Sequence, residues 1–257
     1  MQKLPLIIGH RGAAAVAPEN TLVSFERALA DGADGVEFDV RLAKDGIPVC
    51  VHDANLRRTA LRDGLIADLS SYELAQVDAG SWFNLKFPSL AKPEYTRATI
   101  PMLDAAFHLF KNRSSLLYVE MKCAQHEARE LARAVVQLIR EHSFAQKVVV
   151  KSFLLEAIKE IKLADEKIRT AALFERKVTR PFVIKRKLLE RAIACGADEI
   201  SLHYTLAGAR IVDEARARGL ETIVWTVDNP LWVERARARG IRALITNNPA
   251  LLIAYRT

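Results

Sequence analysis

Two predicted strands of this sequence carry carboxylates that could do chemistry. The stretch VEFDV (36–40) carries Glu37 and Asp39, whose side chains face the same side of a strand. A later strand, LLYVEM (116–121), adds Glu120. Buried carboxylates without partners are costly, and like charges that lie close together raise each other's pKa. A divalent metal ion would neutralise them, and ligation by oxygen alone indicates Mg2+, Ca2+ or Mn2+.

Histidines and cations flank these carboxylates. His10 ends the first predicted strand, LIIGH, and His52 comes near the end of IPVCVHD. Imidazole donates or accepts a proton near neutral pH, and the fixed positive charges of Arg11 and Lys122 suit a phosphate. A metal ion, two cations and two proton-transfer groups are what hydrolysis of a phosphodiester needs. The alternative is a buried ion network, in which Arg11, Arg41 or Lys122 pairs with the carboxylates without a metal.

The other histidines are weaker candidates. His108, His126 and His142 fall on predicted helices or at their ends, which favours solvated surface positions. His203 ends the predicted strand ISLHY, where it fits a pocket wall and a surface position equally. Cys123 follows the strand that carries one of the carboxylates, and we interpret it as a bystander thiol.

Alternating strands and helices must position these residues. From residue 116 onward, short apolar runs alternate with segments of helical period, as in βα units around a parallel sheet. Six such runs are LLYVEM, KVVVKSF, IRTAALF, DEISLHY, TIVWTV and ALIT, and LIIGH and GVEFDV upstream bring the number to eight. Eight parallel strands most economically close into a (β/α)8 barrel of the α/β class, whose chemistry lies at the carboxyl ends of the strands. A doubly wound open sheet is the alternative.

The segment PENTLVSFERALADG (18–32) predicts the first helix. Asn20 is placed to cap this helix, Glu19 suits its positive end, and Gly32 ends it. Both polar residues are therefore expected to shape the chain around the site rather than to react.

One stretch interrupts the alternation of strands and helices. Residues 54–99 contain RDG, DAGSWFN and FPSLAKPEY and show little period, which indicates an insertion, and the turn at Asp45-Gly46 before it predicts a hairpin. Four aromatic residues are expected to hold the insertion to the body: Trp82, Phe83, Phe87 and Tyr95. The whole chain, 1–257, is predicted to be a single domain, a length that α/β barrels reach.

Composition limits the class of protein further. The chain carries a formal net charge of +7 and three cysteines that lack the spacing of a disulfide framework or a thiolate metal site. Its first residues form too short an apolar run for a signal peptide, and no run reaches the roughly 20 residues of a membrane span. A cytoplasmic protein without a transmembrane segment is therefore expected. No stripe of interleaved aromatic and basic residues indicates a nucleic-acid surface.

As a set, these motifs resemble the glycerophosphodiester phosphodiesterase family. The matching pieces run from the first strand to the penultimate one: GHRG (9–12), PENT (18–21), VEFDV (36–40), KDGIPVCVHD (44–53), IPMLDAAF (100–107), VEMK (119–122) and VWTVDN (224–229). The resemblance implies a barrel with a small insertion after its second strand. It also implies one divalent metal ion at Glu37, Asp39 and Glu120, with His10 and His52 as the acid and base.

The resemblance further implies a substrate class. Family members hydrolyse deacylated phospholipids, such as glycerophosphocholine or glycerophosphoethanolamine, to sn-glycerol 3-phosphate and an alcohol, and the position of Trp225 packs against the glycerol. Because Trp225 ends an apolar strand, the alternative is a side chain packed in the hydrophobic core. Asn247 departs from the family, which has aspartate there. The loop ERKVTRP adds Arg176, Lys177 and Arg180 near the active rim, where a solvated loop and a contact to anionic head groups are the two alternatives.

Two rival functions follow from the same residues. A phosphodiesterase of the phospholipase D or C type acting on lysophospholipids would use the same barrel with a more apolar entrance. A non-catalytic protein that binds nucleic acid through its basic surface is the rival from another class, and salt-sensitive retention on DNA without esterase activity would favour it.

Overall fold

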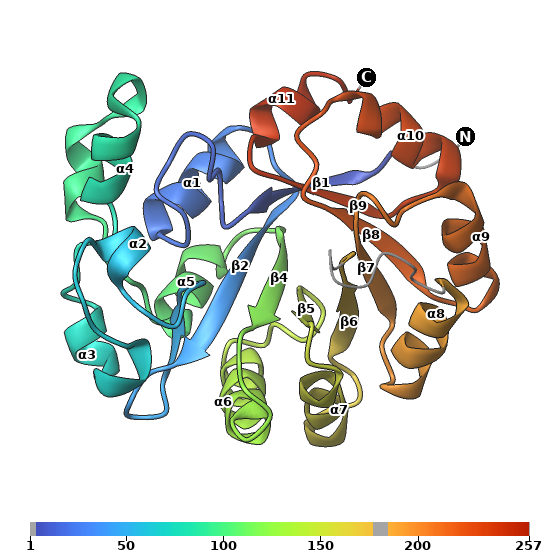
Figure 1. The fold of residues 1–257 in the computed structure, drawn as a ribbon, viewed down its shortest axis with the longest axis horizontal. Helices are drawn as coiled ribbons and strands as arrows, with labels where there is room; N and C mark the ends of the chain where they lie inside the picture. Colours follow the sequence, from blue (N-terminus) through green and yellow to red (C-terminus); the bar gives the residue numbers. More distant parts are fainter. Residues whose placement is uncertain (1–3, 177–184, 257) are drawn as a thin grey trace.

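The computed structural model describes residues 4–176 and 185–256, and its centre is a closed barrel of eight parallel strands (Figure 1). The strands are β1 (Leu6–His10), β2 (Gly35–Leu42), β4 (Leu116–Met121), β5 (Val148–Ser152), β6 (Arg169–Phe174), β7 (Glu199–His203), β8 (Glu221–Trp225) and β9 (Ala243–Thr246). Each pairs with the next in this order, and β9 pairs with β1 to complete the ring. The predicted (β/α)8 barrel is confirmed, and the open sheet is excluded.

Helices surround the strands, as Figure 1 shows. They are α1 (Leu22–Ala30), α5 (Leu103–Phe110), α6 (Ala128–Glu141), α7 (Leu155–Ala164), α8 (Lys185–Ala194), α9 (Ala209–Ala217), α10 (Leu231–Arg239) and α11 (Pro249–Ile253). Side chains alternate along each strand, so Val36, Phe38 and Val40 pack against the helices, while Ile8 and Tyr118 fill the barrel interior. Interior positions nearer the carboxyl end of β2 are left for the carboxylates.

The N-cap of helix α1 lies one residue later than predicted. Thr21 is the N-cap, and its hydroxyl accepts a hydrogen bond from the Ser24 N–H. Asn20 instead takes a left-handed conformation, with φ of 56°. Its side-chain nitrogen donates to Asp39 Oδ2 at 2.9 Å, and its side-chain oxygen accepts from the Asp39 main-chain N–H at 3.1 Å. The prediction that Asn20 caps the helix is wrong, because this side chain is used to hold a carboxylate on β2.

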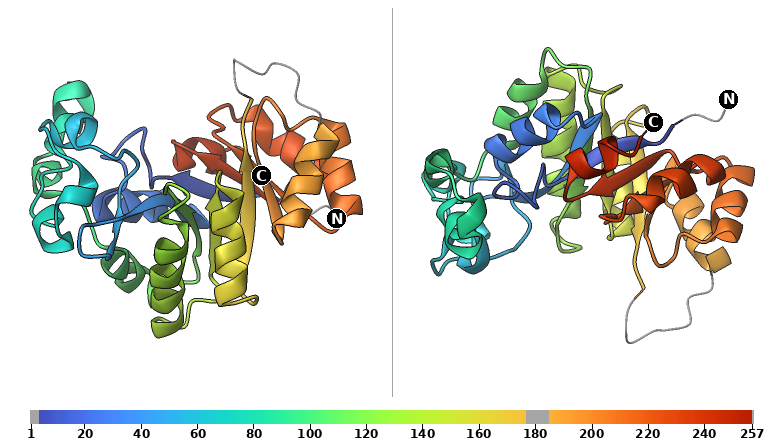
Figure 2. Two further views of the ribbon diagram at one scale, coloured as in Figure 1. Left: turned by 60° about the horizontal axis from the view of Figure 1, so that its bottom comes forward. Right: turned by 90° about the horizontal axis from the view of Figure 1, so that it is seen from above.

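The segment between β2 and α5 lies to one side of the barrel (Figures 1 and 2). Strand β3 (Pro48–Cys50) runs antiparallel to β2, and the turn at Gly46, with φ of 76°, connects them. Short helices follow: α2 (Arg57–Ala60), α3 (Ser71–Leu74), α4 (Ser81–Lys86) and the 3-10 turns η1 (Ile66–Asp68), η2 (Pro88–Leu90) and η3 (Pro93–Arg97). Trp82, Phe83 and Tyr95 pack together with Ala17, and the Tyr95 hydroxyl donates to the main-chain oxygen of Val16 at 2.9 Å. These contacts fix the segment against the loop that follows β1.

A buried ion network lies at the amino ends of the strands, opposite the end that carries Glu37 and Asp39. Glu199 is 0% exposed, accepts from the Tyr118 hydroxyl at 3.0 Å and from Arg169 at 2.8 Å, and faces Arg242 at 3.5 Å. Burial raises the pKa of Glu199, and the two arginines oppose that rise without cancelling it. Glu221 pairs with the same arginines, but its side chain is 42% exposed.

This difference in exposure predicts two different stability losses. Glu199→Ala is expected to lower the free energy of unfolding by about 3–5 kcal/mol, because it leaves two arginines beside a buried void. Glu221→Ala removes a carboxylate from the same arginines at the surface and is expected to cost at most about 1 kcal/mol. Urea unfolding of both variants measures the losses. Equal losses would show that the burial of Glu199 contributes nothing.

Candidate active site

Three carboxylates meet at the carboxyl ends of two neighbouring strands. Glu37 and Asp39 lie on β2 and Glu120 lies on β4, where Asp39 and Glu120 are paired positions. Their exposed fractions are 0%, 1% and 5%, and carboxylate oxygens of all three lie within 4.8 Å of one another. The structure therefore brings together the three carboxylates that strand alternation placed at this end of the barrel.

Arg11 and Lys122 contact this carboxylate cluster. Arg11 Nε lies 3.1 Å from Asp39 Oδ2, and the Arg11 main-chain N–H donates to Glu37 Oε2 at 3.2 Å. Lys122 Nζ lies 3.3 Å from Asp39 Oδ1 and also pairs with Glu120. The two cations expected at a phosphate site thus also pair with the carboxylates, as the ion-network alternative requires.

The turn that presents Arg11 depends on a glycine. Arg11 takes a left-handed conformation with φ of 51°, and Gly12 follows with φ of 87°. A Cβ at Gly12 would lie 2.5 Å from the main-chain carbon of Ser24 on α1, closer than packed atoms approach. The GHRG motif is therefore a tight turn against α1 that points the Arg11 N–H at Glu37.

Arg41 has a different role from the one considered in the ion-network alternative. Its Nε donates to the main-chain oxygen of His52 at 2.8 Å, and its Nη1 donates to the main-chain oxygen of Lys122 at 3.2 Å. A single guanidinium thereby joins the chain after β3 to the chain after β4. Arg41 fixes the positions of two candidate site residues relative to each other.

Lys151 is a third cation in the cluster, and the sequence-based selection missed it. It lies on β5 as the paired position of Glu120 and is 1% exposed. Its Nζ lies 2.7 Å from Glu37 Oε1 and 3.3 Å from Glu120 Oε2. The signal was available in KVVVKSF, because a lysine inside a run of valines on a buried strand requires a buried partner. Three carboxylates therefore face three cations.

The pKa values of the carboxylates show how this charge is shared. Burial raises the pKa of Asp39, but the charges of Arg11 and Lys122 outweigh burial and hold it well below its usual value. Burial likewise raises the pKa of Glu37, and Lys151 contributes most to lowering it overall. Glu120 ends with a raised pKa, because burial and the two neighbouring carboxylates outweigh its lysines. The cluster still favours additional positive charge next to Glu120.

His10 is held by a chain of polar side chains from the last strands. Its Nδ1 lies 2.7 Å from Asn247 Oδ1. The Asn247 amide nitrogen donates to Asp228 Oδ2 at 2.7 Å, so its oxygen must be the atom that accepts from the imidazole. Nδ1 of His10 therefore carries the proton and leaves Nε2, which lies 3.9 Å from Glu37 Oε2, as the basic nitrogen. Asn247 thus orients His10, with Asp228 supplying the negative charge behind it.

His52 is oriented in a similar way by Asp53. Its Nδ1 lies 2.7 Å from Asp53 Oδ1, and Arg58 Nε donates to Asp53 Oδ2 at 2.6 Å. Burial raises the pKa of Asp53, but the hydrogen bonds from His52 and Arg58 lower it overall, so Asp53 stays ionised as an acceptor. This leaves Nε2 of His52 available for proton transfer.

Arg58 also connects the inserted segment to Arg11. Its Nη1 and Nη2 donate to the two oxygens of Glu19 at 2.7 and 2.8 Å. Glu19 in turn accepts from Arg11 Nη1 at 2.7 Å. A continuous chain of ion pairs thus runs from His52 through Asp53, Arg58 and Glu19 to Arg11. The insertion supplies its central residue.

Aromatic side chains form one wall beside the charged cluster. The ring of Trp225 lies 5.5 Å from Phe153 and 5.3 Å from His203, and Lys122 Nζ lies 5.5 Å from the centre of the Phe153 ring. The Trp225 indole nitrogen is buried and has no hydrogen-bond partner among the described residues. Trp225 and His203 therefore adjoin one another at the site end of the barrel, with an unused donor on Trp225.

The remaining candidates lie elsewhere or are unreactive. His126 is exposed and the His108 side chain is 61% exposed, as predicted, but the prediction of a solvated surface is wrong for His142, whose side chain is 8% exposed. Burial raises the pKa of Cys123 to about 11, which keeps it a thiol and supports its reading as a bystander. Arg176 is exposed, while Lys177 and Arg180 lie outside the described residues.

Comparison with known proteins finds one family along nearly the whole chain. The model of the glycerophosphoryl diester phosphodiesterase family matches residues 10–251. The glycerophosphodiester phosphodiesterase of Caldanaerobacter subterraneus subsp. tengcongensis is 29% identical over 250 residues, which cover 96% of each chain. The glycerophosphodiester phosphodiesterase of Bacillus subtilis is 28% identical over 253 residues, 96% of this chain and 84% of that one.

Solved structures are similar over the same length. The phosphodiesterase of Oleispira antarctica, solved in complex with the product sn-glycerol-3-phosphate, has a TM-score of 0.85 at 29% identity and covers 98% of this chain and 96% of that chain. The glycerophosphodiester phosphodiesterase of Thermotoga maritima has a TM-score of 0.74 at 26% identity, with full coverage of both chains. This chain belongs to the glycerophosphoryl diester phosphodiesterase family, and it is a hydrolase of phosphoric diesters.

Proposed function

We propose that the protein hydrolyses glycerophosphodiesters to sn-glycerol 3-phosphate and an alcohol, with a divalent metal ion at Glu37, Asp39 and Glu120. The convergence of three buried carboxylates with two oriented imidazoles at one end of the barrel carries this proposal. The product complex of the Oleispira antarctica relative supports the choice of substrate class.

The carboxylate cluster fits a hard cation. Glu37 Oε1 and Glu120 Oε1 are buried and accept no directed hydrogen bond from the described residues, although lysine ammonium groups lie within ion-pair distance of both. Carboxylate oxygens with free lone pairs are the ligands that Mg2+, Ca2+ and Mn2+ prefer. When bound, such an ion supplies positive charge that stabilises the phosphoryl oxygens in the transition state.

The protein's own residues perform the other parts of the reaction. The Arg11 guanidinium and the Lys122 ammonium bind the phosphodiester oxygens. One imidazole accepts the proton of the attacking hydroxyl as its oxygen bonds to phosphorus, and the other donates a proton to the alcohol oxygen as the bond between that oxygen and phosphorus breaks. Since Nδ1 of His10 and of His52 is engaged, Nε2 is the atom that carries the proton in each case.

Trp225 is placed to recognise the glycerol part of the substrate. Its ring offers an apolar face beside the charged cluster, and its buried indole N–H lacks a protein partner. The apolar face of the ring would pack against the carbon atoms of glycerol.

The direct test is release of glycerol 3-phosphate from glycerophosphocholine and glycerophosphoethanolamine. Protein stripped of metal should release none, and addition of Mg2+, Ca2+ or Mn2+ should restore release. Full activity after metal removal would contradict the metal requirement. Faster release of choline from lysophosphatidylcholine than of glycerol 3-phosphate from glycerophosphocholine would instead favour the lysophospholipid activity.

Lys151 is expected to compete with the metal ion. The three carboxylates are already matched by Arg11, Lys122 and Lys151, so a divalent ion must enter beside an ammonium group that contacts two of its ligands. We therefore expect Lys151→Met to bind Mn2+ at least about tenfold more tightly. The repulsion between the Lys151 ammonium and an ion held by the same carboxylates is worth more than about 1.4 kcal/mol. The metal-free variant should melt at a lower temperature, because Glu37 and Glu120 each lose an ammonium partner.

Calorimetric titration with Mn2+ and thermal melts in a chelator measure these two effects without reference to activity. Lys159→Met, at an exposed lysine on α7, is the matched control and should change neither quantity. Equal Mn2+ affinity in the wild type and in Lys151→Met would show that the lysine does not oppose the ion.

Within residues 4–176 and 185–256, the protein has no helix with the length and apolar character needed to span a bilayer. The cytoplasmic location expected from the sequence stays a prediction, and fractionation of cells that produce the protein would test it.

A further inference from the structure

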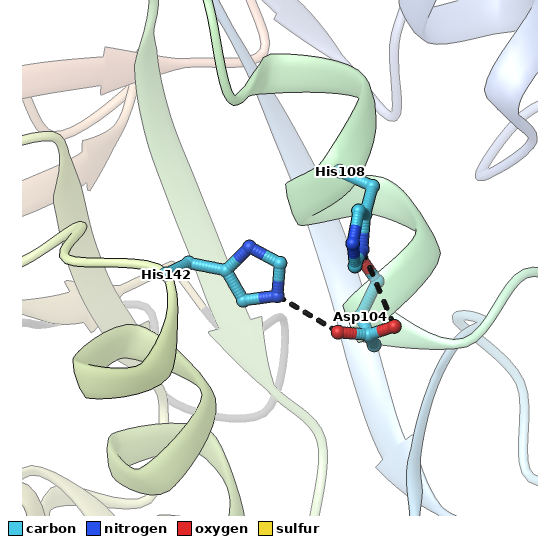
Figure 3. A group of neighbouring side chains, drawn as sticks. All are labelled: Asp104, His108 and His142. Carbon is cyan, nitrogen blue, oxygen red and sulfur yellow. Dashed lines mark hydrogen bonds and ion pairs between the residues drawn. The ribbon is translucent and has the colours of Figure 1, made fainter.

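We propose a second metal site on the outside of the barrel, for a transition metal ion such as Zn2+, formed by Asp104, His108 and His142. Asp104 and His108 lie one turn apart on α5, and His142 follows α6 at its C-cap (Figure 3). The site shares no residue with the candidate active site and does not depend on the proposed function.

The side chains converge on a small volume. Asp104 Oδ1 lies 2.8 Å from His142 Nε2, and Asp104 Oδ2 lies 3.3 Å from His108 Nδ1. One candidate ligand atom from each of the three residues lies within 4.8 Å of the others. Zinc binds nitrogen and oxygen ligands at roughly 2.0–2.2 Å, so ligand atoms at the tetrahedral angle lie about 3.3 Å apart. Small rotations of these side chains would therefore place all three around one ion.

Neighbouring groups hold the two imidazoles in place. The His142 ring packs against Phe107 at 5.5 Å and Phe144 at 5.6 Å between ring centres, and its side chain is 8% exposed. His108 Nδ1 lies 3.0 Å from the main-chain oxygen of Asp104, and an ion bound to this nitrogen would replace that hydrogen bond. The two imidazole rings are nearly perpendicular, with centres 4.7 Å apart. Ligands that are fixed before binding lose less conformational freedom when the ion arrives.

The chemistry of the set selects the class of ion. Two imidazoles and one carboxylate suit Zn2+, Ni2+ or Co2+, whereas Mg2+ and Ca2+ prefer oxygen ligands. The Asp104 and His108 side chains are 47% and 61% exposed, which leaves a fourth position open to water. A bound ion would join α5 to the end of α6, the two helices that flank β4 in the sequence.

The test is calorimetric titration of the full chain with Zn2+ in excess Mg2+, which competes with Zn2+ for oxygen ligands elsewhere on the protein. His108→Ala removes an exposed ligand and should fold normally. It is expected to lower the affinity of one Zn2+ site by about tenfold or more, since loss of a mere supporting contact to a ligand already costs about that much. His142→Gln should remove the same site. His126→Ala, at an exposed histidine outside the cluster, should leave it unchanged.

Two outcomes would overturn the proposal. Equal Zn2+ stoichiometry and affinity in wild type and His108→Ala would show that no ion is held there. An equal loss in His126→Ala would show that exposed imidazoles bind the ion one at a time. The visible spectrum of Co2+ gives a second readout, because a four-coordinate site with nitrogen ligands absorbs more strongly than hydrated Co2+, and His108→Ala should remove that absorption.

Discussion

Glu120→Gln is expected to lose both divalent metal binding and turnover. The substitution keeps the shape of the side chain but removes one of three carboxylates, while Lys122 and Lys151 stay beside it with one partner fewer. The remaining cluster is then net positive, and it repels a divalent ion. We expect kcat/KM to fall by roughly a thousandfold or more, which corresponds to about 4 kcal/mol of transition-state stabilisation.

Calorimetric titration with Mn2+, combined with the glycerol 3-phosphate release assay, measures both losses for Glu120→Gln. Glu166→Gln, at an exposed glutamate, is the matched control and should behave as the wild type. A variant at position 120 that binds the ion normally would remove Glu120 from the ligand set. Normal turnover without bound ion would remove the metal from the mechanism.

His52→Ala is expected to separate turnover from metal binding. His52 pairs with Asp53 rather than with the carboxylate cluster, so its loss should leave the three proposed metal ligands in place. General acid or base catalysis contributes about a hundredfold to ten-thousandfold, and kcat should fall by a factor in that range. Affinity for Mn2+ should stay within about twofold of the wild type.

The pH profile distinguishes loss of proton transfer from a general disturbance of the site. A bell-shaped dependence of kcat/KM on pH in the wild type reports an acid and a base, and His52→Ala should lose one of its two limbs. His126→Ala should keep both limbs and full activity. Full activity in His52→Ala would overturn the acid and base assignment.

The chain of ion pairs through Arg58 gives the inserted segment a place in this mechanism. Arg58 lies on α2, within the segment that lacks clear period in the sequence, and it contacts both Asp53 and Glu19. Through these two carboxylates, the Arg58 guanidinium positions both His52 and Arg11. The geometry explains why a segment outside the βα pattern is attached at this end of the barrel.

Asn247 supports the His10 imidazole through its side-chain amide. An amide is less able than a carboxylate to support the proton on Nδ1 of His10 by charge. Asp228 supplies that charge one hydrogen bond further from His10. It accepts hydrogen bonds from both the side-chain amide and the main-chain N–H of Asn247.

The sequence by itself determined the barrel and the face on which most of the site lies. Strand parity is a local property, so the inward direction of Glu37, Asp39 and Glu120 followed from spacing alone. The number of apolar runs and the alternation with helices likewise followed from local period.

Only the tertiary structure decided which side chains pair across distant elements. Lys151 contacts Glu37 and Glu120 because β5 pairs with β4. The side-chain oxygen of Asn247 contacts His10 because β9 pairs with β1. Asn20 could cap a helix by local rules, yet its side chain binds Asp39 through one hydrogen bond to the carboxylate and one from the main-chain N–H. Those two buried groups gain more from a partner than a helix end that Thr21 already caps. Such choices depend on contacts between residues far apart in the chain, which local spacing does not encode.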